Sequence, residues 1–166
     1  MKSSGKGSWL AIHRSGERRS LMIDPERNSK VSAIISELRD INKDRRRTAV
    51  MKLGMVGGDQ AVRTLIGLIE NSQEDLIVRG RAALMLGKLK DDRAVPHLIR
   101  ALDAPGFVTP FNAAQALGKI GDPRAIDALL SFADNSNDKT RAAAVEALRQ
   151  LGYEFEVAFG ELQPRI

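Results

Sequence analysis

The strongest constraint on the fold of this chain is a sequence pattern that occurs more than three times. Residues 81–95 read RAALMLGKLKDDRAV, and residues 111–126 repeat the pattern as FNAAQALGKIGDPRAI. Residues 48–62 carry it as TAVMKLGMVGGDQAV, and a partial fourth copy covers residues 141–152. Neighbouring copies lie 31 or 33 positions apart. A period of this length indicates a stack of supersecondary units, because each unit buries its apolar face against the next one.

Each copy contains the pattern of two amphipathic helices. In residues 95–102, apolar side chains recur at i, i+3, i+4 and i+7, the stripe of a helix with one buried face. This stripe begins at four positions, Val31, Val62, Val95 and Ile126. We name these four the B helices and expect the A helices between them, at about residues 43–56, 74–89, 109–120 and 137–151. The sequence therefore predicts eight helices: one B helix, three A–B pairs and a final A helix.

Composition supports an all-α fold and limits the location of the protein. Only 4% of the residues are aromatic, so Ala, Leu, Ile and Val must form the core, as in closely packed helices. The chain has no cysteine, which excludes disulfides, thiolate metal ligands and a cysteine nucleophile. No apolar run approaches the ~18 residues of a membrane span, and the N-terminus lacks the apolar segment of a signal peptide. We expect a soluble cytoplasmic protein that binds no membrane.

The repeated pattern resembles that of a known family. Residues 81–99 and 111–130 share the pattern A-A-x-x-L-G-K-(I/L)-x-D-x-R-A-(V/I)-x-x-L-(I/L), which begins at Ala82 in the first copy and at Ala113 in the second. This pattern is similar to the HEAT-like repeat first named for phycobilisome lyases, and the resemblance covers about residues 29–152. It implies an all-α fold, a right-handed α-solenoid of helix pairs. It leaves the function open, because the repeat occurs in scaffolds, lyases and hydroxylases alike.

The two ends of the chain lie outside the repeats. Residues 1–28 are basic and hold two short apolar runs around a polar centre, which predicts a β-hairpin. Residues 153–166 form a tail whose first part, YEFEVAF, alternates apolar and acidic residues like a strand. This tail is expected to cap the last helix, to pair with the hairpin, or to dock on another molecule, including a second copy of the chain. The predicted regions are therefore 1–28, 29–152 and 153–166.

Two sets of repeated residues carry structural predictions. Three glycines lie inside the A helices, at Gly54, Gly87 and Gly118. Each costs up to ~1 kcal/mol relative to Ala in a helix, so we expect close backbone approach of a neighbouring helix there. Three aspartates at the turns within pairs are placed to N-cap the B helices: Asp59, Asp92 and Asp122. The Asp91-Asp92 pair is accordingly interpreted as part of a cap and not as a pair of catalytic carboxylates.

Catalytic and metal-binding motifs are scarce. His13 and His97 are the only histidines, and neither is followed by Glu. The His-Glu pairs with which deoxyhypusine hydroxylase, a protein with a similar repeat, holds two irons are therefore missing. The chain also has no nucleophile-elbow motif and no phosphate-binding loop. We expect no catalytic site, no metal and no cofactor.

The outward face of the B helices is the first candidate for a binding surface. Stacked B helices line the concave side of such solenoids, and concave surfaces are used for binding. The predicted partner-binding residues on this ridge are Arg63, His97, Arg100, Asp127 and Ser131. Their mixed polarity suits a peptide or a protein surface better than a uniform track of phosphates. The alternative is an ordinary solvated helix face.

The second candidate is a basic patch near the N-terminus. The first 50 residues hold twelve Lys and Arg against six Asp and Glu, and the centre of this patch is Arg14, Arg18, Arg19, Arg45, Arg46 and Arg47. Such a patch suits an acidic protein surface or a nucleic acid, or it only keeps the protein soluble. Together the patterns predict a non-enzymatic protein-interaction adaptor. A nucleic-acid-binding protein and a bilin-lyase-like accessory protein are the alternatives.

Overall fold

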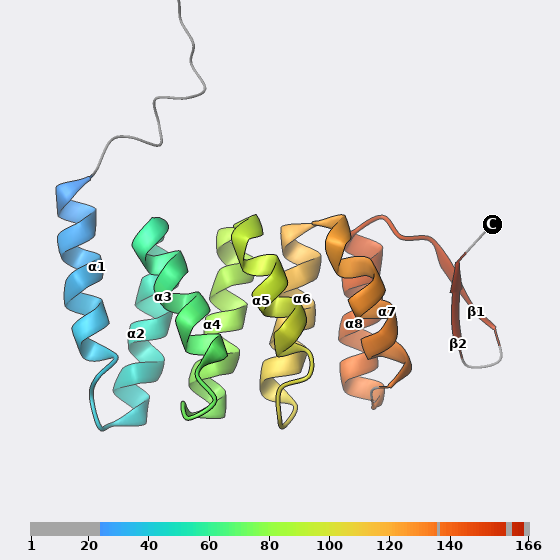
Figure 1. The fold of residues 1–166 in the computed structure, drawn as a ribbon, viewed down its shortest axis with the longest axis horizontal. Helices are drawn as coiled ribbons and strands as arrows, with labels where there is room; N and C mark the ends of the chain where they lie inside the picture. Colours follow the sequence, from blue (N-terminus) through green and yellow to red (C-terminus); the bar gives the residue numbers. More distant parts are fainter. Residues whose placement is uncertain (1–23, 136, 159–160, 165–166) are drawn as a thin grey trace, which may run out of the picture.

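The computed structural model of this chain describes residues 24–135, 137–158 and 161–164. Within these ranges, eight α-helices are followed by two short strands (Figure 1). The helices are α1 (Pro25–Glu37), α2 (Lys43–Val56), α3 (Asp59–Glu70), α4 (Leu76–Leu89), α5 (Val95–Ala101), α6 (Val108–Ile120), α7 (Ile126–Asp134) and α8 (Asp138–Gln150). The eight predicted helices are therefore present, and the all-helical repeat fold is confirmed.

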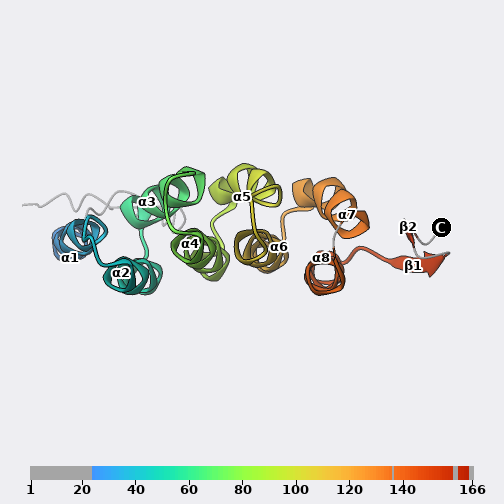
Figure 2. The same cartoon turned by 90° about the horizontal axis from the view of Figure 1, so that it is seen from below.

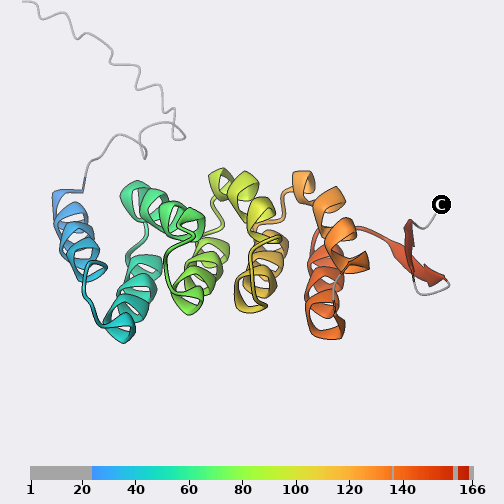
Figure 3. The ribbon, with the colours of Figure 1, turned by 60° about the horizontal axis from the view of Figure 1, so that its bottom comes forward.

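The helices lie in two layers along the long axis of the molecule. The A helices α2, α4, α6 and α8 form one layer, and the B helices α3, α5 and α7 form the other (Figure 2). Each of these B helices follows its A helix through a short turn, and the resulting hairpins lie side by side (Figure 3). The first B helix, α1, packs against α2 and α3 at one end of the stack. This arrangement is an α-solenoid.

The core extends through the whole stack. One leucine of each A helix is completely buried at the same repeat position: Leu53, Leu86, Leu117 and Leu148. The apolar stripes of the B helices meet these leucines, with Leu65, Leu98 and Leu129 equally buried. Each leucine of this kind contributes roughly 1.5 to 3 kcal/mol through its removal from water. The repeat thus builds its core one layer at a time, and no single residue forms its centre.

The turns inside the pairs differ from the prediction at two of the three aspartates. The side chains of Asp91 and Asp122 cap short 3-10 turns before α5 and α7 by accepting the backbone N–H groups of Arg93 and Arg124, at 3.1 and 2.9 Å. Asp91 therefore performs the capping that the sequence assigned to Asp92. Asp59 is the first residue of α3 and does not cap it. Two preceding glycines with positive φ angles turn the chain there and shift the helix start.

The glycines of the A helices allow neighbouring A helices to touch. A Cβ atom on Gly87 would lie 2.6 Å from the Cα atom of Ala116, and one on Gly118 would lie 2.7 Å from the Cα atom of Ala147. Real Cβ atoms essentially never come that close to another atom. The predicted close approach of backbones is therefore confirmed at these two positions. At Gly54 the neighbour is the side chain of Met85.

The two ends of the chain provide less information about their predicted roles. The predicted N-terminal hairpin falls outside the described residues. At the other end, β1 (Phe155–Ala158) pairs antiparallel with β2 (Glu161–Pro164), so the structure has two short strands where the sequence predicted one. Whether this tail caps the solenoid or docks elsewhere stays a prediction. Among the described helices, none has the length and apolar character required to cross a membrane.

Candidate functional site

The predicted partner-binding residues lie on three successive B helices and fall into two groups. Arg63 and Asp127 are exposed at equivalent repeat positions, near the starts of α3 and α7. His97 is the third residue of α5, and Arg100 and Ser131 lie farther along α5 and α7. The structure therefore does not bring the five residues together into one site.

In the first group, Arg63 belongs to a set of ion pairs that links neighbouring repeats. Arg63 pairs with Asp59 one helical turn before it, and Asp59 also pairs with Arg93 of the next repeat. The hydrogen bond from Arg93 lowers the pKa of the Asp59 carboxyl below its ordinary value. In the following repeat, Arg124 donates to the backbone carbonyl of Asp92, at 3.4 Å. Arg63 is thus engaged by its own helix.

In the second group, His97 and Arg100 share a carboxylate that the sequence analysis missed. Oε1 of Glu70, the last residue of α3, lies 2.7 Å from Nδ1 of His97 and is also paired with Arg100. The hydrogen bonds from His97 and then from Arg100 lower the pKa of Glu70 below its usual value. The repeat could have indicated this carboxylate, because the positions equivalent to Glu70 in the next two B helices also hold acidic residues, Asp103 and Asp134.

Two hollows lie beside each other on the B layer. One, of about 310 Å³, is lined by side chains of α3, α4 and α5 together with residues that follow α5: Ile69, Glu70, Arg79, His97, Arg100, Ala101, Asp103 and Ala104. The other, of about 280 Å³, lies between α5 and α7 and is lined by Ile99, Leu102, Asp103, Ala128, Ser131, Phe132 and Asn135. Asp103 borders both hollows. We name them the Arg79 hollow and the Ser131 hollow.

The predicted basic patch is only partly within the described residues. Arg14, Arg18 and Arg19 lie outside them, whereas the three arginines at the start of α2 are each held by carboxylates of this chain. Arg45 pairs with Asp40 at 3.0 Å, on the edge of a third hollow that is also lined by Glu37, Asp44, Thr48 and Lys52.

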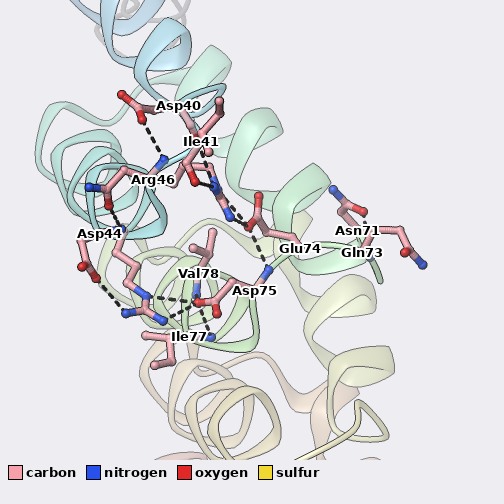
Figure 4. Close-up of polar contacts among 12 residues, drawn as sticks. Asp40, Ile41, Asp44, Arg46, Asn71, Gln73, Glu74, Asp75, Ile77 and Val78 are labelled. Carbon is pink, nitrogen blue, oxygen red and sulfur yellow. Dashed lines mark hydrogen bonds and ion pairs between the residues drawn. The ribbon is translucent and has the colours of Figure 1, made fainter.

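Arg46 joins α2 to Glu74, just before α4 (Figure 4), and Arg47 joins it to the N-cap residue Asp75. Arg46 pairs with Glu74 at 2.9 Å and also donates to the carbonyl oxygens of Asp40 and Ile41. Arg47 pairs with Asp75 at 2.9 Å and with Asp44 at 2.8 Å. The anions that these helix-start arginines attract are therefore supplied within the chain.

No candidate catalytic or metal centre stands out in the part of the chain that the structure describes. There, no group of three or more His, Asp or Glu side chains is arranged to hold a metal ion. The carboxyls of Asp91 and Asp122 have pKa values below the ordinary range, chiefly because Arg93 and Arg124 donate to them. Because their pKa values are lowered, these two carboxyls are ionised at neutral pH, where they cap turns and form ion pairs.

Comparison with known proteins identifies the family. A family model for HEAT repeats matches residues 31–109 and 109–149, which is most of the solenoid. The chain belongs to the HEAT-repeat family. No curated protein matches its sequence.

Solved structures contain the same HEAT-repeat fold. Human deoxyhypusine hydroxylase in complex with glycerol is 24% identical, with a TM-score of 0.68, over 77% of this chain and 45% of the hydroxylase. The complex of CpcE and CpcF of phycocyanin lyase from Nostoc sp. PCC7120 contains a chain that is 29% identical, with a TM-score of 0.65. That match covers 74% of this chain and 53% of the other. This HEAT-repeat protein thus spans about half the length of these two relatives.

Proposed function

We propose that this HEAT-repeat protein is a non-enzymatic adaptor that binds another protein through its B layer. The observation that carries the proposal is the pair of adjoining hollows, which side chains of three successive B helices line and which Asp103 joins. Extended surfaces built by successive repeats are the usual binding surfaces of solenoid proteins. The mixture of acidic, basic and apolar groups in both hollows favours a peptide or protein surface.

Two further findings support this proposal. The HEAT repeats cover residues 31–109 and 109–149, so the chain consists largely of a module suited to interaction surfaces. One of the similar structures, that of CpcE and CpcF, is itself a complex of two proteins. We also propose that two copies of the chain can form a dimer through their terminal segments. This proposal rests on the apolar residues in the sequence of these segments, and symmetric dimers are common among soluble proteins.

The test compares substitutions on the B layer of the solenoid with a charge reversal on the A layer. Immobilised full-length protein is incubated with extract of its host, and the bound proteins are identified by mass spectrometry at two salt concentrations. Arg100→Glu on the B layer is expected to abolish capture of a discrete protein, as is His97→Ala. Lys88→Glu, an exposed reversal on the A helix α4, is the matched control and should leave capture intact. Retained capture by Arg100→Glu, or equal loss with Lys88→Glu, would contradict the proposal.

Nucleic-acid binding is the first alternative. It depends on the basic N-terminal segment, but Arg45, Arg46 and Arg47 already have carboxylate partners. Binding through phosphate contacts weakens steeply with salt, roughly in proportion to the number of contacts. A purified complex that absorbs at 260 nm and dissociates with rising salt would support nucleic-acid binding. If no such complex is found, the adaptor function stays the proposal.

A bilin-lyase-like accessory role is the second alternative, and one observation favours it. The chain is 29% identical to a chain in the phycocyanin lyase complex. Mixing the protein with a free bilin and recording the visible spectrum tests this role directly. A saturable change of absorbance would support bilin handling, whereas an unchanged spectrum would remove it.

A further inference from the structure

Arg79 carries a buried charge for which the described part of the chain supplies no carboxylate. The side chain lies on α4 and is only 6% exposed. Its Nε and Nη2 atoms donate to the backbone carbonyl of Ile69 at 3.2 and 3.0 Å. No carboxylate oxygen of the described residues lies within 4.0 Å of its nitrogens. Buried charges are costly unless they are paired, so this guanidinium is suited to bind an anion.

The preceding repeat shows what distinguishes Arg79 from its equivalent residue. Arg46 occupies the same position of α2 and donates to carbonyl oxygens in the turn between α1 and α2, but it also has a carboxylate, Glu74, at 2.9 Å. The position equivalent to Glu74 in the next repeat is Phe107, which is 53% exposed. The chain therefore keeps the arginine at this joint and replaces its acidic partner with an aromatic residue that faces the solvent.

The two carboxylates in the Arg79 hollow do not form ion pairs with Arg79. In the Arg79 hollow, the Glu70 carboxylate is already engaged by His97 and Arg100. Asp103 also lines the hollow, but its oxygens lie beyond ion-pair distance from Arg79. Arg79 forms part of the wall of an open space of about 310 Å³, large enough for a carboxylate-bearing side chain.

We propose that the Arg79 hollow binds the carboxylate of an Asp or Glu side chain in a peptide segment of the partner protein. This inference rests on the proposed adaptor function and names the chemistry of its ligand. A guanidinium presents parallel N–H groups that match a carboxylate. The nearby oxygens of Glu70 and Asp103 repel a phosphate dianion more strongly than a carboxylate monoanion.

Exposed apolar groups at the same end of the solenoid fit a peptide that carries such an acid. Leu76 and Ile77 in the first turn of α4 are 40% and 37% exposed, and Phe107 precedes the first turn of α6. The loop before Phe107 lies beside Leu76: a Cβ atom added to Gly106 would lie 3.3 Å from Cδ1 of Leu76. Apolar side chains beside the acidic residue of the peptide would cover these groups.

The test uses nuclear magnetic resonance of the full-length protein labelled with ¹⁵N. The probe is the peptide acetyl-Leu-Glu-Leu-amide, and acetyl-Leu-Gln-Leu-amide is its matched neutral control. The Glu peptide is expected to shift the Arg79 Nε–Hε signal and the amide signals of the hollow in a saturable way. The Gln peptide should bind at least about tenfold more weakly, as expected for loss of a charge-assisted hydrogen bond. Equal shifts with the two peptides, or no shift at the hollow, would overturn the proposal.

Two variants test whether Arg79 itself binds the Glu peptide. Arg79→Gln keeps a donor for the Ile69 carbonyl and should lose roughly tenfold or more in affinity for the Glu peptide. Arg93→Gln, which removes an exposed arginine elsewhere on the B side, should retain wild-type affinity. Unchanged affinity of a folded Arg79→Gln variant would overturn the assignment. If that variant does not fold, the comparison of the two peptides on the wild-type protein still decides.

Inorganic phosphate is titrated as a second probe. Phosphate that binds the hollow more tightly than the Glu peptide would overturn the assignment to a protein carboxylate. The outcome of the host-extract experiment is independent of these titrations. A partner captured through Arg100 by a protein whose hollow ignores the Glu peptide would refute this inference and keep the adaptor function.

Discussion

The joint between α2 and α4 and the joint between α4 and α6 occupy the same place in successive repeats, yet different forces hold them. At the first, Arg46 and Arg47 pair with Glu74 and Asp75 across the two A helices. At the second, the matching positions hold Arg79 and Gly80 on α4, and Phe107 and Val108 at the start of α6. A Cβ atom on Gly80 would lie 2.6 Å from Cγ1 of Val108, so close apolar packing replaces an ion pair there.

The comparison shows that one backbone arrangement accepts two kinds of side-chain interaction. What the repeat requires is an apolar core and a small residue where the A helices touch. The polar groups at the start of each A helix are free to vary. Variation at those positions can therefore create a binding feature without a change of fold, and the unpaired Arg79 is such a feature.

The largest expected effect is on the contact between backbones. Gly87→Ala should lower the free energy of unfolding by about 2 to 3 kcal/mol, because the new methyl group meets the Cα atom of Ala116. The matched change at the ion-paired joint, Gly54→Ala, should cost a similar amount, because the new methyl group would lie 2.6 Å from Cβ of Met85, an atom that side-chain rotation cannot move. Urea unfolding of both variants measures the losses, with Gly67→Ala as the control because its methyl group would meet nothing within 4 Å. A loss at Gly54 or Gly87 no larger than that at Gly67 would contradict the prediction.

The next effect concerns the ion pair of Arg46. Its side chain is 18% exposed and also donates to the carbonyls of Asp40 and Ile41, so Arg46→Ala should cost about 2 kcal/mol. A double-mutant cycle with Glu74→Gln should give a coupling energy of about 1 kcal/mol. A coupling near zero would mean that the joint depends on packing alone, like its neighbour.

A smaller effect depends on pH. Asp75 is partly buried, which raises its pKa, but hydrogen bonds from Arg47 and the N–H groups of Val78 and Ile77 outweigh this and lower the pKa below 3.8. Because the folded pKa is lower than the unfolded one, its contribution to stability is complete above about pH 4 and is lost as the pH falls through the folded value.

Asp75→Asn tests this contribution, because asparagine is an equally good N-cap but carries no charge. The variant should lose about 1 kcal/mol at pH 7 and approach the wild type in acid. Thermal midpoints measured from pH 7 to pH 2.5 follow the convergence. A gap between the two proteins that stays constant over this range would show that the charge of Asp75 does not matter.

The smallest effect is expected from the exposed link between Arg93 and Asp59. Surface ion pairs contribute little because water and salt screen them. Arg93→Gln should therefore shift the thermal midpoint less than Arg46→Ala does, and the shift should vanish in about 1 M salt. A decrease of the thermal midpoint that persists in high salt would show that Arg93 stabilises the fold through more than a screened surface ion pair.

Much of the architecture could be predicted from the sequence because the repeat restates the same information several times. The stripes that begin at Val31, Val62, Val95 and Ile126 located the B helices, and the recurrent glycines indicated where the A helices touch. The cap was assigned to Asp92 in place of Asp91, because the residues alone do not show the 3-10 turn that precedes α5.

The candidate site was less predictable because it depends on side chains that the period brings together from different repeats. His97 and Arg100 were identified from their outward positions, but the carboxylate that joins them comes from Glu70, 27 and 30 positions away. Arg79 was missed because it lies within an A helix among buried residues. A comparison of the polar positions of the repeats, Arg46 with Arg79 and Glu74 with Phe107, was the signal that could have found it.

The contact of A helices at their glycines has a mechanical consequence. Neighbouring A helices meet at backbone distance at Gly87 and Gly118, and such contacts can neither shorten nor tilt much without a clash. The B helices contact one another far less extensively. Bending of the solenoid is therefore concentrated on the B side, where the helices can spread or draw together. The width of both hollows would change with such a bend, so a partner that filled one of them, as proposed above, would also set the curvature of the solenoid.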